Sequence, residues 1–248
     1  MPLIHRCPKC AARFDPPMAE ASECPQCGIW FHKRAIGAAT APDAPPEALS
    51  QHRDALPVEA ALASRDPIRY YGRAAALLFV AIWGLRLIAM DYRGGETGGS
   101  FMHNIVLPIH EAGHVLFMPF GEFMTILGGS LFQVALPLAI GAAFLLRQRD
   151  AFGAAICLWW AGASLVDLAP YIWDSLSPQL ILLGGHTGED GPHDWIYLLE
   201  RLGALRRAHA WGAAAHHLGT LMMLGGVGWG GWWLWQARHD PARTPAPL

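Results

Sequence analysis

Residues 105–118 read IVLPIHEAGHVLFM, and the rest of the chain is interpreted outward from this stretch. It holds the pattern H-E-x-x-H, from His110 to His114, within an apolar run. On a helix, positions i and i+4 share a face, so both imidazoles can reach one metal ion, with Glu111 beside it as a general base. Ionisable groups at membrane depth are costly unless they have a purpose. The stretch therefore predicts a zinc hydrolase with its active site in the bilayer.

The composition is that of a membrane protein. Of the 248 residues, 53% are hydrophobic and only 15% are charged, whereas soluble proteins carry about 25% charged residues. The 11 tryptophans favour an interfacial aromatic belt. A net charge of -2 gives no basic field, so we expect no nucleic-acid partner. Residues 1–7 lack a signal-peptide core, so we expect no cleaved export signal.

Four of the five cysteines form two C-x-x-C knuckles, and Cys157 lies alone in an apolar stretch. Two knuckles supply four thiolates, the ligand set of a structural zinc site; here they are Cys7, Cys10, Cys24 and Cys27. A redox dithiol is the alternative, but the pair of knuckles and the lack of a βαβ pattern argue against it. A thiolate zinc site favours a reducing compartment.

The chain is predicted to be an all-α polytopic membrane protein with a small N-terminal zinc ribbon. We expect the ribbon at residues 1–35, a flexible linker at 36–66, a transmembrane domain at 67–238 and a disordered tail at 239–248. About five spans are expected, at Ala74–Met90, Phe101–Phe120, Leu131–Leu146, Ala151–Trp173 and Trp211–Trp235. The glycines of the last span suggest close helix packing.

Two further segments are predicted to lie near or on the membrane. Met124–Ser130 is glycine-rich and is expected to be a short extended, re-entrant segment beside the site. Ile196–His209 is predicted to be an amphipathic helix at the interface.

Arginines before the first span place the ribbon in the cytoplasm, and we expect the chain in a bacterial inner membrane. Five spans would then put Arg147 and Arg149 outside, which conflicts with the positive-inside rule.

A catalytic zinc usually has three protein ligands, and H-E-x-x-H supplies two. The candidates for the third are Asp174, Asp167, Glu122, His186 and His193. His103 lies seven residues before His110 and is predicted to be a hydrogen-bonded interior histidine. Gln133 is expected to hydrogen-bond to a neighbouring helix or to face the site.

H-E-x-G-H on an apolar helix, followed by a glycine-rich segment and an acidic motif, resembles the site-2 proteases, which are intramembrane zinc metalloproteases. That family takes its third ligand from Asn-x-x-Pro-x-x-x-Leu-Asp-Gly. Residues 167–175, DLAPYIWDS, are similar: Asp167 stands for the Asn, Pro170 matches, and Asp174 takes the ligand position after a one-residue contraction. Trp173 and Ser175 replace the Leu and the Gly.

The resemblance covers residues 101–175 and implies Asp174 as the third ligand, with Asp167 next. The alternative role for Asp167 is to orient a ligand histidine from outside the coordination sphere. A third alternative is His193 and Asp194, within a loop that closes over the site.

The expected function is peptide-bond hydrolysis in transmembrane or membrane-proximal protein substrates, with Glu111 as base. His110, His114 and Asp174 would hold a catalytic Zn²⁺, and the cysteines a structural one. The alternative is a non-catalytic zinc-binding membrane adaptor, a pseudoprotease whose ribbon recruits a protein partner. A transporter is a third reading.

Overall fold

The computed structural model describes residues 3–7, 9–19, 22–31 and 67–239. The chain divides into two compact units, Met1–Ala55 and Leu56–Leu248, and each is described by itself. The predicted linker, residues 36–66, lies outside the described residues. So does the predicted tail, residues 239–248, apart from His239.

The first unit is built around the two cysteine knuckles. Strand β1 (Leu3–Arg6) pairs antiparallel with β2 (Arg13–Ala19). In each knuckle, the N–H of the first cysteine donates to a carbonyl beyond the second: Cys7 to Ala12 at 2.8 Å and Cys24 to Ile29 at 2.9 Å. A module this small buries too little apolar surface to fold without a further stabiliser.

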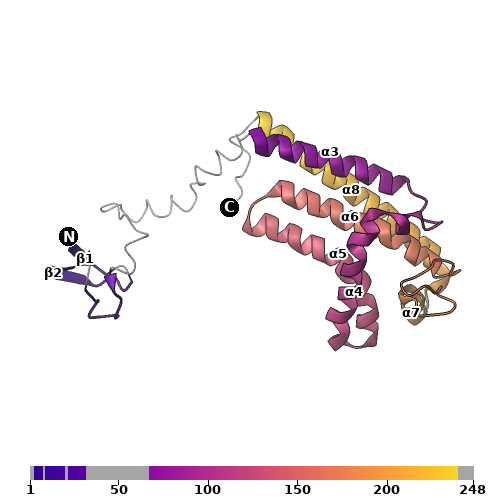
Figure 1. The fold of residues 1–248 in the computed structure, drawn as a ribbon, viewed down its shortest axis with the longest axis horizontal. Helices are drawn as coiled ribbons and strands as arrows, with labels where there is room; N and C mark the ends of the chain where they lie inside the picture. The colour runs from indigo at the N-terminus through magenta and orange to yellow at the C-terminus, as the bar shows by residue number, and fades with distance from the viewer. Residues whose placement is uncertain (1–2, 8, 20–21, 32–66, 240–248) are drawn as a thin grey trace. The chain divides into compact units, whose positions relative to one another are not determined.

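The second unit is helical, and α6 is its central element (Figure 1). The α6 helix packs along α8 and contacts α3 and α5, whereas α4 runs across the direction shared by α3, α6 and α8. The helices are α3 (Pro67–Ala89), α4 (Phe101–Phe117), α5 (Glu122–Arg147), α6 (Ala151–Asp174), α7 (Asp194–Arg201) and α8 (Ala208–His239). Short 3₁₀ turns are η2 (Glu96–Gly99), η3 (Met118–Phe120) and η4 (Leu205–Arg207).

Polar side chains cap the helices where the sequence changes from loop to apolar run. The Ser100 hydroxyl accepts from the His103 N–H at 3.2 Å and begins α4. Asp150 accepts from the N–H groups of Phe152 and Gly153 at 3.1 Å and begins α6. Its other carboxylate oxygen pairs with Arg73 of α3 at 3.2 Å. One acid therefore caps α6 and ties its start to α3.

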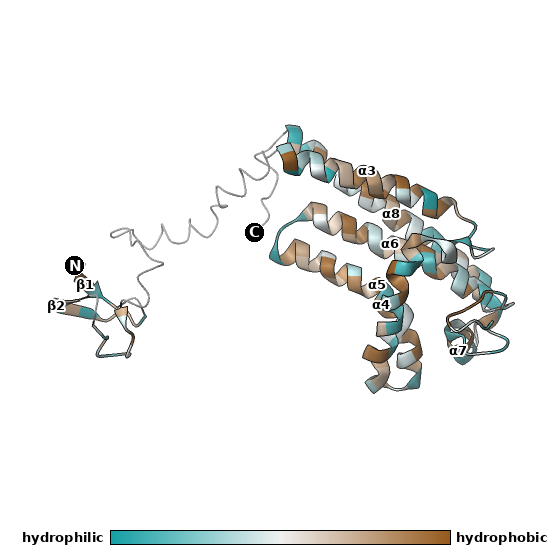
Figure 2. Cartoon of the chain, in the orientation of Figure 1, coloured by the Kyte–Doolittle hydropathy of each residue, from teal (hydrophilic) through white to brown (hydrophobic). Residues whose placement is uncertain are grey.

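Within the described residues, three helices are long and apolar enough to cross a membrane: α3, α5 and α6. Figure 2 shows the hydropathy of the residues along these helices, with hydrophobic residues in brown. On α3 the side chains of Leu78, Phe79, Ile82 and Leu85 are each at least 60% exposed, which suits contact with lipid rather than with water. A membrane protein is thus plausible. The five-span count stays a prediction, because α4 has only 17 residues and α8 is not among the three.

The prediction of an extended segment at Met124–Ser130 is wrong, because these residues belong to α5. Their glycines serve helix packing instead of breaking the helix. A Cβ on Gly113 of α4 would lie 2.3 Å from the Gly128 carbonyl oxygen, so neither helix could carry a side chain there.

Glycine has the same role between α6 and α8. A Cβ on Gly162 would lie 2.5 Å from the Gly219 carbonyl oxygen, and one on Gly226 would lie 2.7 Å from that of Ala155. Close packing of the last predicted span is therefore confirmed for Gly226. A Cβ added to Gly225 or Gly228 would meet no atom within 4 Å.

The helix predicted at Ile196–His209 is interrupted. The α7 helix ends at Arg201, and Gly203 follows with a φ of 63°.

Candidate metal centres

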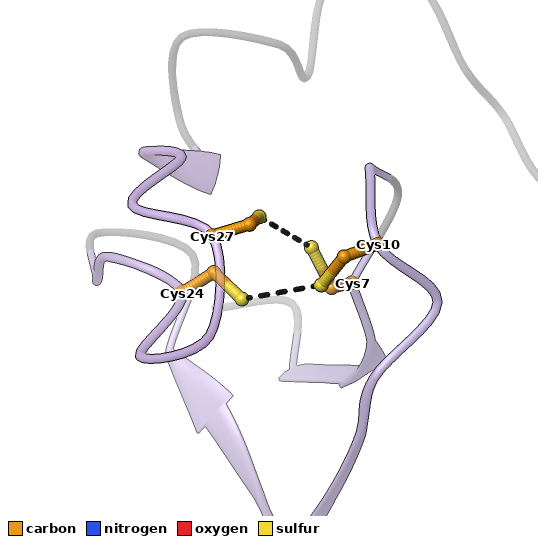
Figure 3. Close-up of side chains that lie close together, drawn as sticks. All are labelled: Cys7, Cys10, Cys24 and Cys27. Carbon is orange, nitrogen blue, oxygen red and sulfur yellow. Dashed lines mark hydrogen bonds between the residues drawn. The ribbon is translucent and has the colours of Figure 1, made fainter.

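The four ribbon cysteines converge as a metal site requires (Figure 3). The Sγ atoms of Cys7 and Cys27 lie 3.6 Å apart, and those of Cys10 and Cys24 lie 3.7 Å apart. A disulfide would need about 2.05 Å, whereas a zinc–sulfur distance of about 2.3 Å gives a tetrahedron edge of about 3.8 Å. The cluster can bind a metal ion, in keeping with a structural zinc.

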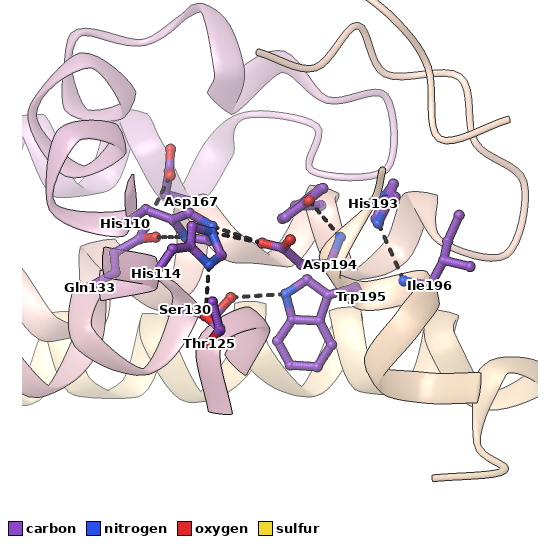
Figure 4. Close-up of polar contacts among 11 residues, drawn as sticks. His110, His114, Thr125, Ser130, Gln133, Asp167, His193, Asp194, Trp195 and Ile196 are labelled. Carbon is purple, nitrogen blue, oxygen red and sulfur yellow. Dashed lines mark hydrogen bonds and ion pairs between the residues drawn. The ribbon is translucent and has the colours of Figure 1, made fainter. Parts of the chain in front are cut away.

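A second centre is formed where α4 meets α5 and α7 (Figure 4). His110 and His114 lie one turn apart on α4, and the Nε2 atom of each points at the same oxygen of Asp194, the first residue of α7. The distances to Asp194 Oδ2 are 3.0 Å from His110 and 3.2 Å from His114. Glu111 belongs to the same cluster, since its carboxylate lies within 4.8 Å of the two histidines' ligand atoms.

The other ring nitrogen of His114 is held from α5. Its Nδ1 lies 2.9 Å from the Thr125 carbonyl oxygen. A carbonyl only accepts, so the proton of the ring sits on Nδ1.

The His110 ring is held in the same way by a side chain. Its Nδ1 lies 3.0 Å from Gln133 Oε1. The orientation of this amide is fixed by Asp167, whose carboxylate accepts from Gln133 Nε2 at 3.2 Å. Gln133 therefore presents its oxygen to His110, and Nδ1 carries the proton. The prediction that Gln133 bonds to a neighbouring helix or faces the site holds on both counts.

Because each Nδ1 donates, a neutral ring of either histidine carries its lone pair on Nε2, whereas a protonated ring donates from Nε2 to the Asp194 carboxylate. Burial raises the pKa of Asp194, but the contacts with His110 and His114 outweigh it and lower the pKa to about 2, so the carboxylate is ionised. A carboxylate that faces two imidazole nitrogens is satisfied either by protons on Nε2 or by a metal ion that replaces them, and this set of ligand atoms suits zinc.

Of the candidates for the third ligand, only Asp194 contacts both Nε2 atoms in the described chain. Asp167 and His186 line the same cavity but contact other groups. Asp174 is the first candidate for the third ligand from the sequence. Its Oδ1 accepts a hydrogen bond from the Gln179 N–H, in the segment after α6, at 2.8 Å. Asp174 therefore lies at the start of the segment after α6 and not at the histidine pair in this structure, and its role as a zinc ligand stays a prediction. The physical reason is that Asp174 ends α6 and turns its carboxylate to the segment that follows, whereas α7 brings Asp194 back to α4.

The remaining candidates also have other partners. Asp167 lies 3.1 Å from His103 Nδ1, so His103 is hydrogen-bonded as predicted. Asp167 also accepts from Gln133, and through Gln133 it orients His110 without contacting it. Glu122 faces Arg201 at 3.7 Å on the surface. The Nδ1 atom of His186 lies 3.0 Å from the Thr187 carbonyl oxygen. His193 Nδ1 accepts from the Ile196 N–H at 3.3 Å and caps α7.

A cavity of about 590 Å³ opens onto the histidine pair. Its polar wall includes His103, His110, Glu111, His114 and Asp194. Its apolar wall includes residues 180–183, which belong to the connecting segment, defined here as residues 175–193 between α6 and α7. The volume falls in the usual range for a small-ligand or peptide site, about 300–1,000 Å³.

Gly129 of α5 leaves room for the two imidazoles. A Cβ there would lie 2.6 Å from Nε2 of both His110 and His114. Their Nδ1 hydrogen bonds keep the rings from turning away, so Gly129→Ala is expected to lower the affinity of this pair for Zn²⁺ by roughly tenfold or more, measured by competition with a chelator. The matched control is Gly225→Ala, whose added Cβ meets nothing within 4 Å. Equal affinity in the two variants would contradict this reading.

Comparison with known proteins finds no match to this chain among family models, curated proteins or solved structures. The interpretation of both centres therefore rests on their own geometry.

Proposed function

We propose that the chain is an intramembrane zinc peptidase of the site-2 protease type. The observation that carries the proposal is the meeting of two imidazole Nε2 atoms at one oxygen of Asp194, at 3.0 and 3.2 Å, beside the carboxylate of Glu111. A structural site would close around its metal with four protein ligands, whereas a catalytic site leaves a position open to a cavity. Here the histidine pair faces a cavity whose wall also includes Glu111.

His110, His114 and Asp194 are the proposed holders of the ion. Zinc bound there would supply a Lewis acid and an activated water for attack on a peptide carbonyl. Glu111 takes the proton from the attacking water and passes it to the leaving amine. Gln133 and the Thr125 carbonyl keep the protons of both imidazoles on Nδ1, so that the Nε2 lone pairs stay available.

The cavity holds the substrate in this proposal. Its wall of apolar side chains from residues 180–183 favours an apolar segment, and its polar wall meets the peptide bond to be cut. A peptide must be extended for its backbone to reach a metal, so the substrate is a locally unwound part of a transmembrane or membrane-proximal protein. The proposed location is a bacterial inner membrane.

The finer topology is part of the same proposal. The spans are α3, α4, α5, α6 and α8, the ribbon is cytoplasmic and holds a structural zinc, and it contacts a protein partner. The adaptor alternative shares the ribbon zinc and differs only at the histidine site, so metal content separates the two.

Metal stoichiometry tests the proposal. The two clusters predict two zinc ions per chain. Cys7→Ser with Cys10→Ser is expected to remove one, and His110→Ala to remove the other while leaving the ribbon ion, because the clusters share no residue. Zinc is counted by mass spectrometry of metals in purified protein. A single zinc that is lost with the cysteines and retained in His110→Ala would favour the adaptor instead.

A further inference from the structure

The connecting segment leads from α6 to Asp194, the proposed third ligand, so the contacts at its two ends decide where that ligand lies. It leaves α6 at Asp174 and returns at Asp194, the first residue of α7. At the outgoing end, Asp174 Oδ1 accepts from the N–H groups of Gln179 and Leu180 at 2.8 and 3.1 Å. These two bonds fix the first turn of the segment.

At the returning end, the same carboxylate meets His193. Nδ1 of His193 accepts from the Ile196 N–H, so the ring proton sits on Nε2. That atom lies 3.6 Å from Asp174 Oδ2, and the His193 side chain is fully buried. Neither atom hydrogen-bonds to another described residue. The buried N–H and the buried carboxylate oxygen therefore have only each other as polar partners in the described chain.

Tyr171, one turn before Asp174 on α6, completes the contact. Its ring stacks on His193, with centroids 4.3 Å apart and planes at 30°. Its hydroxyl accepts from the Asp194 N–H at 2.9 Å. The end of α6 thus holds the two consecutive residues that bring the carboxylate of Asp194 to the histidine pair.

We propose that Asp174 is a positioning residue that joins both ends of the connecting segment and, through His193, holds Asp194 beside His110 and His114. The inference rests on the proposed zinc site but assigns Asp174 no contact with the metal. One oxygen of its carboxylate binds the outgoing backbone and the other faces the returning His193. Asp174, which the sequence motif places at a ligand position, thus acts through His193 on the proposed ligand Asp194.

Asp174→Asn tests this directly. The amide oxygen can still accept from Gln179 and Leu180, but the amide nitrogen then faces the His193 N–H, donor against donor. We expect the zinc affinity of the histidine site to fall by about 10- to 100-fold, the usual effect of losing an outer-shell partner. The ribbon zinc should be retained. The measurement is a chelator titration of the full chain in detergent, in which the two ions are released in separate steps.

His193→Asn is the second variant, and it keeps the proposal testable if Asp174→Asn does not fold. Asparagine preserves the cap of α7 and removes the contact with Asp174. The same loss of affinity is expected, and the double variant should bind zinc no more weakly than the weaker single variant, because both changes break one contact. Asp190→Asn, an exposed acid of the same segment, is the control and should leave both release steps unchanged.

Two results would overturn the inference. One is wild-type zinc affinity in both Asp174→Asn and His193→Asn. The other is complete loss of the second zinc in Asp174→Asn together with its retention in Asp194→Ala, which would make Asp174 the ligand. Because zinc release is read without a substrate, a chain that binds two ions and cleaves no peptide would remove the proposed peptidase and leave this inference standing.

Discussion

Glu111→Gln is expected to abolish peptide hydrolysis while the chain stays folded and binds two zinc ions. Glutamine keeps the size of the side chain but cannot take a proton from the attacking water. General-base catalysis contributes on the order of 10² to 10⁴ in rate, so turnover should fall by that factor. The assay is cleavage of a quenched-fluorescence library of apolar peptides in detergent micelles, with zinc content measured on the same sample.

Glu122→Gln is the matched control. Glu122 follows on the next helix and lies on the surface opposite Arg201, so its loss should leave turnover unchanged. If Glu111→Gln turned over the library as fast as Glu122→Gln, the assigned role of Glu111 would be wrong, whatever the metal content.

Asp194→Ala is expected to remove the second zinc and the activity together. The two histidines alone offer an incomplete ligand set. In this variant the carboxylate that both Nε2 atoms face is missing. We expect the affinity to fall by more than about 100-fold, beyond the range seen for outer-shell changes. The same chelator titration measures this loss, and the ribbon step should not move, because the ribbon cysteines form a separate cluster.

The comparison of Asp194→Ala with Asp174→Asn is the informative one. We expect loss of the second zinc ion in Asp194→Ala and weaker binding of that ion in Asp174→Asn. The reverse order would restore the ligand that the resemblance implied and would require the connecting segment to rearrange when the metal binds.

Local patterns predicted the parts of this molecule that depend on near neighbours. The knuckles fix four thiolates because each pair sits on one tight turn, and the i, i+4 histidines share a helix face wherever that helix lies. Most helices begin or end within a few residues of the predicted spans, as for α6, predicted at Ala151–Trp173 and found at Ala151–Asp174. Apolar runs between polar caps are sufficient signals for such elements.

The parts that failed depend on contacts far apart in the chain. Met124–Ser130 looked β-tolerant because of its glycines, but their role is set by α4, which packs against them. Asp194 lies 80 residues or more from both histidines, so spacing alone could not pair them. The signal for Asp194 was its place in a polar loop just before an amphipathic helix. As a third-ligand candidate it ranked behind Asp174 and Asp167, which belong to a motif whose second half departs from the family pattern.

Asp167 shows the intermediate case. Its place on α6 suggested either a ligand or an outer carboxylate, and the sequence could not separate them because that choice depends on Gln133 lying between Asp167 and His110. A side chain that bridges three helices cannot be inferred from any one of them.

The most direct test of the central claim is a crystal structure of the zinc-loaded chain with anomalous data collected at the zinc edge. The account predicts one peak among the four cysteines and a second within about 2.2 Å of His110 Nε2, His114 Nε2 and an Asp194 carboxylate oxygen. A second peak bound by Asp174 or Asp167 instead, or no second peak, would contradict it.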